Sequence, residues 1–324
     1  MRLSRCNGRG ECSCFTSEPM KIALAEGEST ILPATRRKLC DESRHAMVWG
    51  GQQVPAFATD AAVLWTRLRP IRAADMAHFP SLRYIVCPAT GTDHIDHAEA
   101  ERRGIKVLSL KGEPGLVNVR ATVEHTIGLI LALTRRIPAA AEHVRRGGWD
   151  RYAFEGTDLA GKWVLVVGNG RIGRQVRKIL HDLGCCAYYT ERNPEQGRDL
   201  LSLLPAADLV TVHCDLNPTS RGLFGPAEFA AMKPGAFFIN TARGAIVQEQ
   251  ALLDALRGHL GGAALDVVEG EPGCSDALRI AAGALPNLIV TPHIGGCTRE
   301  AREQTEGLMV DRLLKEVADG HGLR

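Results

Sequence analysis

Three side chains in the second half of the chain have the chemistry needed to move a proton and to bind a carboxylate. A histidine is the usual general acid or base near neutral pH, and an adjacent carboxylate stabilises its imidazolium and fixes its tautomer. An arginine can clamp a carboxylate and polarise a carbonyl. His293, Glu271 and Arg243 could fill these roles. Each also has an ordinary structural explanation (a loop histidine, a turn residue before Pro272, a solvated arginine), so the prediction rests on the set.

A glycine turn earlier in the chain predicts a nucleotide site. Gly168, Gly170 and Gly173 follow the apolar residues 164–167 and precede residues 174–183, which have helical spacing. The first glycine allows a tight turn, the second lets a pyrophosphate approach the backbone, and the third lets helix and strand pack closely. The helix N-terminus adds free N–H groups for the phosphates. The residues expected to contact a dinucleotide here are Gly168, Asn169, Gly170, Arg171, Ile172 and Gly173.

An acidic residue predicts which dinucleotide binds. Glu191 ends the next apolar stretch, residues 187–190, eighteen residues after Gly173. An acid at this place accepts both ribose hydroxyls and repels a 2′-phosphate, which favours NAD over NADP. Arg192 keeps the alternative open, because it could neutralise a 2′-phosphate, although it could also stack on the adenine. The sequence predicts NAD.

The elements that would position these residues have the pattern of a parallel sheet. Six strands are expected at residues 163–167, 187–190, 209–213, 236–240, 262–267 and 288–291, with helices at 226–232 and 248–257. Six strands are what a doubly wound dinucleotide-binding sheet uses, and its ligands bind outside the carboxyl ends of the strands. The further residues expected at the cofactor site for this reason are His213, Cys214, Thr241, Ala242 and Asp266. Arg243 and His293 would lie at the same edge, beside the nicotinamide.

A smaller α/β unit is expected before this one. Strands at 21–25, 62–65, 82–87 and 106–110 alternate with helices at 71–79 and 95–103, the second closed by Gly104. Residues 118–136 are predicted to form one long helix, buried nearly all round and ended near Pro138, that could join the units and contact another subunit. An amphipathic helix at 298–318 is expected to return to the first unit. The predicted domains are a disordered extension at 1–19, a substrate domain at 20–117 and 293–324, and a dinucleotide-binding domain at 118–292.

Composition limits the class of protein. A chain of 324 residues with 45% hydrophobic and 23% charged residues is typical of a soluble two-domain protein. A net charge of +2 gives no reason to expect nucleic acid or membrane partners. With no run of 18 apolar residues and no apolar signal segment, we expect a cytoplasmic protein. No metal is predicted, because Cys6, Cys12 and Cys14 lack a fourth ligand and suitable spacing.

These motifs, in this order, resemble the D-isomer-specific 2-hydroxyacid dehydrogenase family, and the resemblance runs from about Lys21 to the C-terminus. The segments that carry it are Val123–Leu133, Gly168–Gly173, Ile239–Gly244, Ala264–Pro272 and Thr291–Gly296. It implies an α/β fold with a doubly wound parallel-sheet dinucleotide-binding domain and a smaller flavodoxin-like substrate domain. It also implies a cleft that closes on the substrate and a homodimer built largely on the cofactor domains.

The resemblance further implies roles for individual residues. Arg243 would bind the substrate, His293 would be the acid/base, Glu271 would support it, and Asp266 would contact the nicotinamide amide. The backbone of the segment 89–93, at Thr90 and Gly91, would bind the substrate carboxylate. Formate dehydrogenases of this fold tend to carry an amide in place of Glu271, so the glutamate favours hydroxyacid chemistry.

Two departures from the family pattern concern the ligands. Glu191 stands where an aspartate is more usual, and its longer side chain should still reach the ribose. Residues 110–115 differ from the usual segment, and Lys111 and Arg120 could favour a substrate with an acidic or phosphorylated side chain, as in phosphoglycerate dehydrogenases. Solvated side chains are the ordinary alternative for both.

The resulting hypothesis is an NAD-dependent oxidoreductase that interconverts a D-2-hydroxy acid and its 2-keto acid. Two rival hypotheses stay open. One is an NAD(H)-sensing corepressor that resembles the C-terminal-binding-protein branch of the family, and the other is a formate- or phosphite-type dehydrogenase. Turnover of a 2-keto acid with NADH would separate the hypothesis from both.

Overall fold

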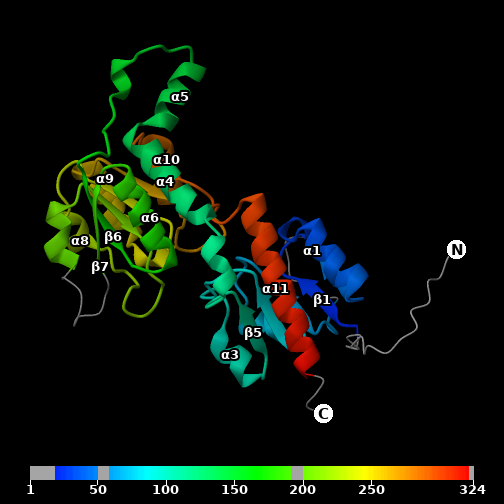
Figure 1. The fold of residues 1–324 in the computed structure, drawn as a ribbon. Coiled ribbons are helices and arrows are strands. Elements are labelled where there is room, and N and C mark those ends of the chain that lie inside the picture. The colour runs from blue at the N-terminus through cyan, green and yellow to red at the C-terminus, as the bar shows by residue number, and fades with distance from the viewer. Residues whose placement is uncertain (1–18, 50–57, 191–199, 321–324) are drawn as a thin grey trace.

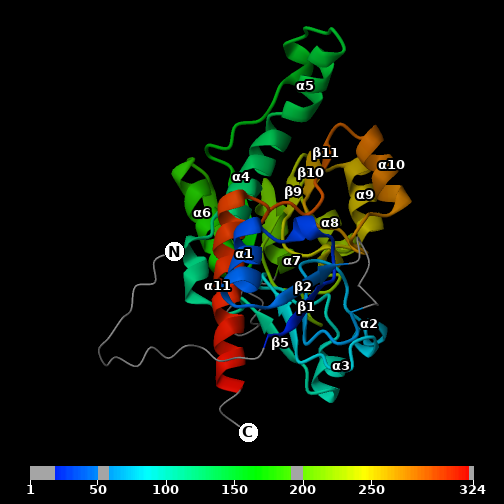
Figure 2. The same ribbon diagram turned by 90° about the vertical axis from the view of Figure 1, so that its right-hand side faces the viewer.

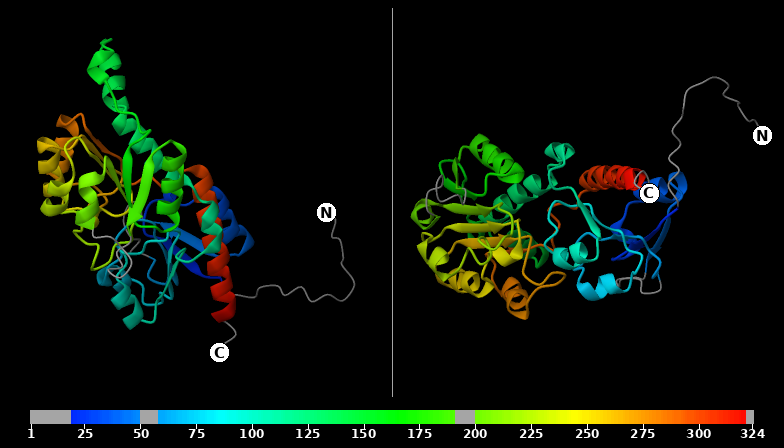
Figure 3. Two further views of the ribbon diagram at one scale, coloured as in Figure 1. Left: turned by 60° about the vertical axis from the view of Figure 1, so that its left-hand side comes forward. Right: turned by 90° about the horizontal axis from the view of Figure 1, so that it is seen from below.

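The computed structural model describes residues 19–49, 58–190 and 200–320. They form two parallel sheets, which lie in the two lobes that Figure 1 shows side by side and that Figure 3 shows again from below. The expected α/β fold class is confirmed. The predicted extension 1–19 falls almost entirely outside the described residues, as do Glu191 and Arg192.

The first sheet is built from β1 (Lys21–Leu24), β2 (Ala46–Trp49), β3 (Val63–Trp65), β4 (Tyr84–Cys87) and β5 (Lys106–Ser109). Its order β2-β1-β3-β4-β5 is that of flavodoxin-like sheets. Alternate residues of each strand point to opposite faces, so Ile22 and Leu24 enter one apolar cluster and Ala23 enters the other. Of these strands only β2 was not predicted. It is a short edge strand, and Met47 and Val48 on it are not fully buried.

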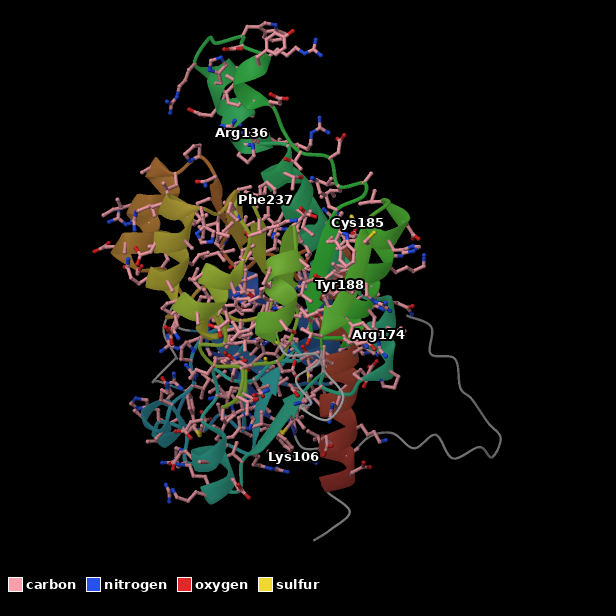
Figure 4. The ribbon with its side chains drawn as sticks, turned by 90° about the vertical axis from the view of Figure 1, so that its left-hand side faces the viewer. Lys106, Arg136, Arg174, Cys185, Tyr188 and Phe237 are labelled. Atoms are coloured by element: carbon pink, nitrogen blue, oxygen red, sulfur yellow. The ribbon has the colours of Figure 1, made fainter. Side chains whose placement is uncertain are left out.

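Helices cover both faces of this sheet. On one side lie α2 (Ala73–Ala77) and α3 (His97–Arg102), shorter than the predicted helices at the same places. On the other lie α1 (Pro33–Arg37) and α11 (Arg299–Gly320). The predicted return of the last helix is confirmed: it buries Met309, Val310, Leu313 and Val317 against the sheet. Lys106 of β5, labelled in Figure 4, forms an ion pair with Glu316 of α11.

The second sheet contains all six predicted strands. They are β6 (Trp163–Val167), β7 (Cys186–Thr190), β8 (Leu209–Val212), β9 (Phe237–Asn240), β10 (Gly262–Leu265) and β11 (Leu288–Val290), in the order β11-β10-β9-β8-β6-β7. Its helices are α6 (Arg171–Asp182), α7 (Leu200–Leu203), α8 (Pro226–Ala231), α9 (Glu249–Gly258) and α10 (Asp276–Ala284), of which α7 and α10 were not predicted. After β6 the chain goes to β7 on one side and later returns to β8 on the other. The carboxyl end of this reversal point is where open α/β sheets bind ligands.

The predicted helix 118–136 is α4 (Ala121–Thr134), which ends before Pro138 as expected, and a second helix that was not predicted, α5 (Ile137–Arg145), follows it. Arg136 has a left-handed backbone (φ 53°) and breaks the helix, and Pro138 lies in the first turn of α5, where proline is tolerated. The expectation that this helix is buried nearly all round was wrong, because Glu124, Gly128 and Leu131 form an exposed stripe. Figure 2 shows α5 projecting beyond the lobes.

Within the described ranges one segment, Pro114–Thr134, is long and apolar enough to cross a membrane by length and composition, with a mean hydropathy of 1.3. The core helix of a soluble protein meets the same criterion. Here α4 packs on the second sheet, where Val123, Ile130 and Leu133 join Val164 and Ile239 in one apolar cluster.

Candidate active site

A cavity of 590 Å³ lies between the carboxyl ends of the two sheets. Segments that follow β4, β9, β10 and β11 contribute to its wall, together with the start of α6 and the N-terminal part of α11. The sequence-predicted residues that line it are Thr90, Gly91, Arg171, Ile172, Thr241, Arg243, Asp266, Glu271 and His293. The structure thus brings together side chains that are up to 203 positions apart in the sequence.

His293 and Glu271 form a hydrogen-bonded pair on the wall of this cavity. His293 Nδ1 lies 2.5 Å from Glu271 Oε2, and Glu271 Oε1 accepts a hydrogen bond from the backbone N–H of Val268 at 2.8 Å. The backbone of His293 is left-handed (φ 54°) and its N–H donates to the carbonyl of Asp266 at 2.8 Å. Because Nδ1 is engaged by the carboxylate, Nε2 is the ring nitrogen left to exchange a proton with a ligand.

Arg243 reaches across the cavity to the first sheet. Its Nε donates to Asp93 Oδ1 at 2.7 Å, and its Nη1 donates to the carbonyl of Ala242 at 2.7 Å. A Cβ placed on Gly91 would lie only 1.4 Å from Arg243 Nη2. The guanidinium therefore lies directly against the backbone of Gly91. This residue belongs to the segment 89–93, which is expected to bind the substrate carboxylate.

Asp266 fastens the segment that carries His293. Its buried carboxylate accepts hydrogen bonds from His125 Nε2 (3.1 Å), Thr291 Oγ1 (2.6 Å) and the backbone N–H groups of Ile294 (2.9 Å) and Gly295 (2.7 Å). Burial alone would raise the pKa of Asp266, but these hydrogen bonds together hold it below its ordinary value. Asp266 lines the cavity as expected, yet both its oxygens already have partners in the protein.

The glycine turn leads from β6 into α6 with the expected local geometry. Gly168 has φ 104°, a conformation that favours glycine, and a Cβ on Gly173 would lie 2.0 Å from the carbonyl oxygen of Gly168. Gly170 caps α6, and a Cβ added there would meet no atom within 4 Å. The backbone at the start of α6 is consequently open to an approaching phosphate.

Two side chains of this turn also suit a dinucleotide, one as a donor to its phosphates and one as an acceptor from its hydroxyls. Arg171 Nη1 donates to the carbonyl of Val119 at 2.8 Å, and burial lowers the pKa of Arg171. Asn169 Oδ1 is buried without a hydrogen-bond partner among the described residues. A partly desolvated guanidinium and an unsatisfied amide beside a helix N-terminus fit the phosphates and hydroxyls of a dinucleotide.

His213 and Cys214, directly after β8, lie next to the glycine turn but are not among the residues that line the cavity, whereas Thr241 after β9 lines it. A Cβ on Gly168 would lie 2.7 Å from the backbone N of Cys214, so the glycine turn lies against this segment. His213 Nε2 is 2.8 Å from Thr211 Oγ1, and burial lowers the pKa of His213 to about 3. Thr241 is buried, with its Oγ1 2.9 Å from Thr126 Oγ1. The imidazole of His213 is therefore neutral at physiological pH.

Some predicted residues lie elsewhere, and others were missed. Lys111 and Arg120 are exposed and are not among the residues that line the cavity. Arg67 and Arg302 line it instead, and both reach the fully buried carboxylate of Glu306, at 3.0 and 3.4 Å. Sequence reasoning also missed His125, although a histidine on an apolar helix was a usable signal. In the described ranges no group of three or more His, Cys, Asp or Glu side chains could hold a metal ion.

Comparisons with known proteins concern the family and the fold of the chain. A sequence model of the D-isomer specific 2-hydroxyacid dehydrogenase, NAD binding domain, matches residues 127–295. The chain is 33% identical over 309 residues to a glycerate dehydrogenase of Methylorubrum extorquens, covering 92% of this chain and 96% of the relative. It is 36% identical over 255 residues to a D-3-phosphoglycerate dehydrogenase of Mycobacterium tuberculosis, covering 75% of this chain but 46% of the relative. Among solved structures it resembles the TT0316 protein from Thermus thermophilus, with a TM-score of 0.79, 33% identity, and 93% and 97% of the two chains covered.

Proposed function

The chain belongs to the D-isomer-specific 2-hydroxyacid dehydrogenase family, and we propose that Arg243, Glu271 and His293 perform its reaction. As a member it is an NAD-dependent oxidoreductase that interconverts a D-2-hydroxy acid and its 2-keto acid. The observation that supports the assignment is the convergence on one cavity of the His293–Glu271 pair and the guanidinium of Arg243 against Gly91.

Each residue has one task when a keto acid is reduced. Arg243 and the backbone at Thr90 and Gly91 hold the substrate carboxylate. His293 gives the proton on Nε2 to the carbonyl oxygen, while Glu271 on Nδ1 stabilises the imidazolium and fixes the ring. NADH, when bound, supplies the hydride. In the oxidising direction His293 takes the proton from the substrate hydroxyl, so the same pair serves both directions.

The cofactor would be held by the second sheet. The open backbone at Gly170 and the guanidinium of Arg171 fit a pyrophosphate, the unsatisfied amide oxygen of Asn169 would accept from a ligand hydroxyl, and His213 and Thr241 would line the path toward the nicotinamide. Neutral His213 adds no positive charge beside a cofactor whose nicotinamide is cationic when oxidised. We keep Glu191 and Arg192 as the proposed ribose and adenine contacts.

We further propose the domain division 20–117 with 293–324, and 118–292. Packing of α11 on the first sheet and of α4 on the second supports it.

A homodimer is proposed because α5 and the segment after it carry exposed apolar side chains: Ile137 (52% exposed), Val144 (51%), Trp149 (89%) and Tyr152 (83%). A second copy of the chain would cover them. A cytoplasmic location is proposed because the seven described cysteines form no disulfide with one another, as in a reducing compartment.

For the substrate side chain we propose an acidic or phosphorylated group, with Arg67 and Arg302 in place of the sequence-predicted Lys111 and Arg120. Two guanidinium groups at this end of the cavity share the one carboxylate of Glu306, and the nearby carboxylate of Glu26 accepts from the backbone N–H groups of residues 67–69. Arg67 Nε is buried with no hydrogen-bond partner within the described ranges. A panel of keto acids with neutral and with anionic side chains tests this: the anionic members should have the lower KM.

The test of the residue roles is His293→Ala, assayed with NADH and the best keto acid of the panel. We expect kcat to fall roughly 10²- to 10⁴-fold with NADH affinity kept. His181→Ala, which removes an exposed histidine of α6, is the matched control and should change neither. Near-full turnover by His293→Ala would remove the assignment. NADH binding without turnover of any keto acid would instead favour an NAD(H)-sensing corepressor. NAD reduction by formate or phosphite alone would favour a formate- or phosphite-type dehydrogenase.

A further inference from the structure

Asp93 is an acidic side chain in the cavity to which neither the sequence nor the proposed mechanism gives a role. It lies between β4 and α3 of the first sheet, whereas its partner Arg243 follows β9 of the second. The 2.7 Å hydrogen bond between Arg243 Nε and Asp93 Oδ1 therefore joins the two lobes across the cavity. The two side chains are 28% and 36% exposed, so water screens the pair only in part.

The turn that carries Asp93 is fastened on both sides of it. His94 accepts a hydrogen bond on its carbonyl from the N–H of Ile71 at 2.9 Å, and Asp96 donates from its N–H to the carbonyl of Ile71 at 2.9 Å. The N–H of Ile95 donates to the carbonyl of Thr92 at 3.0 Å. A carboxylate on such a turn is a fixed point against which a long, flexible side chain can be oriented.

The other acids that line the cavity are already engaged. Glu271 pairs with His293, Glu269 with Arg221 at 3.3 Å, and Asp266 accepts hydrogen bonds from its own set of donors. Asp93 is the acid that contacts Arg243. Burial would raise the pKa of Asp93, but Arg243 lowers it below its ordinary value, so the carboxylate stays charged at neutral pH.

The contacts of Arg243 leave one end of its guanidinium for a ligand. Of its five N–H groups, Nε–H is taken by Asp93 and one Nη1–H by the carbonyl of Ala242. The three that remain are on Nη1 and Nη2, and Nη2 lies against Gly91. That end of the guanidinium can bind a carboxylate through two parallel hydrogen bonds.

We propose that Asp93 is a positioning residue that holds the guanidinium of Arg243 across the interdomain cavity, with its Nη1–Nη2 end turned to the substrate carboxylate. This inference rests on the proposed function, since it requires Arg243 to bind the substrate. Without Asp93 the arginine keeps its charge but loses its fixed orientation, so substrate binding and turnover suffer while NADH binding does not.

The test is a double-mutant cycle on Asp93 and Arg243, with kcat and KM for the best keto acid and the dissociation constant of NADH as readouts. Asp93→Ala should raise KM about 10- to 100-fold, because a charge-assisted hydrogen bond and a fixed orientation are lost. Asp93→Asn, whose amide oxygen still accepts from Nε, should restore most of the loss. Asp60→Ala removes an exposed ion pair of the same lobe, with Lys21, and should change nothing.

The decisive comparison is made in an Arg243→Gln background. There Asp93→Ala should add less than about a twofold effect, because Asp93 acts through Arg243. If turnover in that background is too slow, the dissociation constant of oxalate from the NADH complex replaces KM. An unchanged KM in Asp93→Ala, or an equal effect in both backgrounds, overturns the proposal. Unchanged kinetics in Arg243→Gln alone would instead overturn the proposed role of Arg243.

Discussion

The contact between Gly91 and Arg243 makes a sharp prediction for Gly91→Ala. A Cβ at this position would lie 1.4 Å from Nη2 and 2.6 Å from Cζ of Arg243, and 3.1 Å from Asp93 Oδ1. Ordinary contact begins at 3.4 Å, so the guanidinium must withdraw by about 2 Å. Because the obstructing atoms are the end of a flexible side chain, the fold can accommodate the methyl group at little cost in stability.

Catalysis should suffer far more than the fold. Withdrawal removes a charge-assisted hydrogen bond to the substrate, which is worth about 1.5–3 kcal/mol, so kcat/KM should fall about 10- to 150-fold. The assay is NADH oxidation with the best keto acid, alongside the Tm and the dissociation constant of NADH, both of which should stay near the wild-type values.

Gly283→Ala on α10 is the matched control. A Cβ there would meet no atom within 4 Å, so kinetics should not change and stability should rise by up to about 1 kcal/mol. Wild-type kcat and KM in Gly91→Ala would refute the reasoning, because Arg243 and the Gly91 loop could not then form the carboxylate site.

Three further predictions concern Glu271, His213 and the α5 arm. Glu271→Gln should lower kcat/KM about 5- to 30-fold, the difference between a charge-assisted and a neutral hydrogen bond to His293, measured in the same NADH assay. Burial lowers the pKa of His213 from 6.5 to about 3, so between these values the unfolded chain binds a proton that the folded chain does not, and stability falls as the pH drops. From pH 7 to pH 5 this should cost about 2 kcal/mol in urea unfolding, a loss absent from His213→Asn. Trp149→Asp with Val144→Asp should convert a dimer to a monomer in sedimentation, and a monomeric wild type would contradict the proposed assembly.

The family, the fold class and the NAD cofactor expected from the sequence are confirmed. The second sheet could be predicted strand by strand because strands buried on both faces are continuous apolar runs, as at 163–167. The edge strand β2 is also a short apolar run, Ala46–Trp49, and sequence reasoning missed it. The helix before Pro138 ends as expected, but α5, which has Pro138 in its first turn, was not predicted, because a proline can both follow one helix and begin the next.

Residues of the proposed site that directly follow strands could be predicted from the sequence. Residues that reach the site only through tertiary packing could not. Arg243 and His293 follow strands that end at the same sheet edge, so their approach to one cavity could be expected. The partners that orient them could not: Asp93 lies 150 positions from Arg243, and His125 lies 141 positions from Asp266. The contact of Arg302 with Glu306 follows from their spacing of four residues on α11, but nothing in the local sequence of Arg67 indicates that it reaches the same carboxylate.

Because α11 packs on the first sheet, the first lobe is completed only after the whole second sheet has been synthesised. Residues 20–110 leave the ribosome early, yet the apolar cluster that contains Leu24, Trp65 and Val86 is completed only when residues 309–317 emerge. The second sheet, by contrast, is encoded without interruption and can mature while the rest of the chain is still being translated. The nascent protein must therefore shield an unfinished apolar sheet face for most of its translation, and that face is where chaperones would engage it.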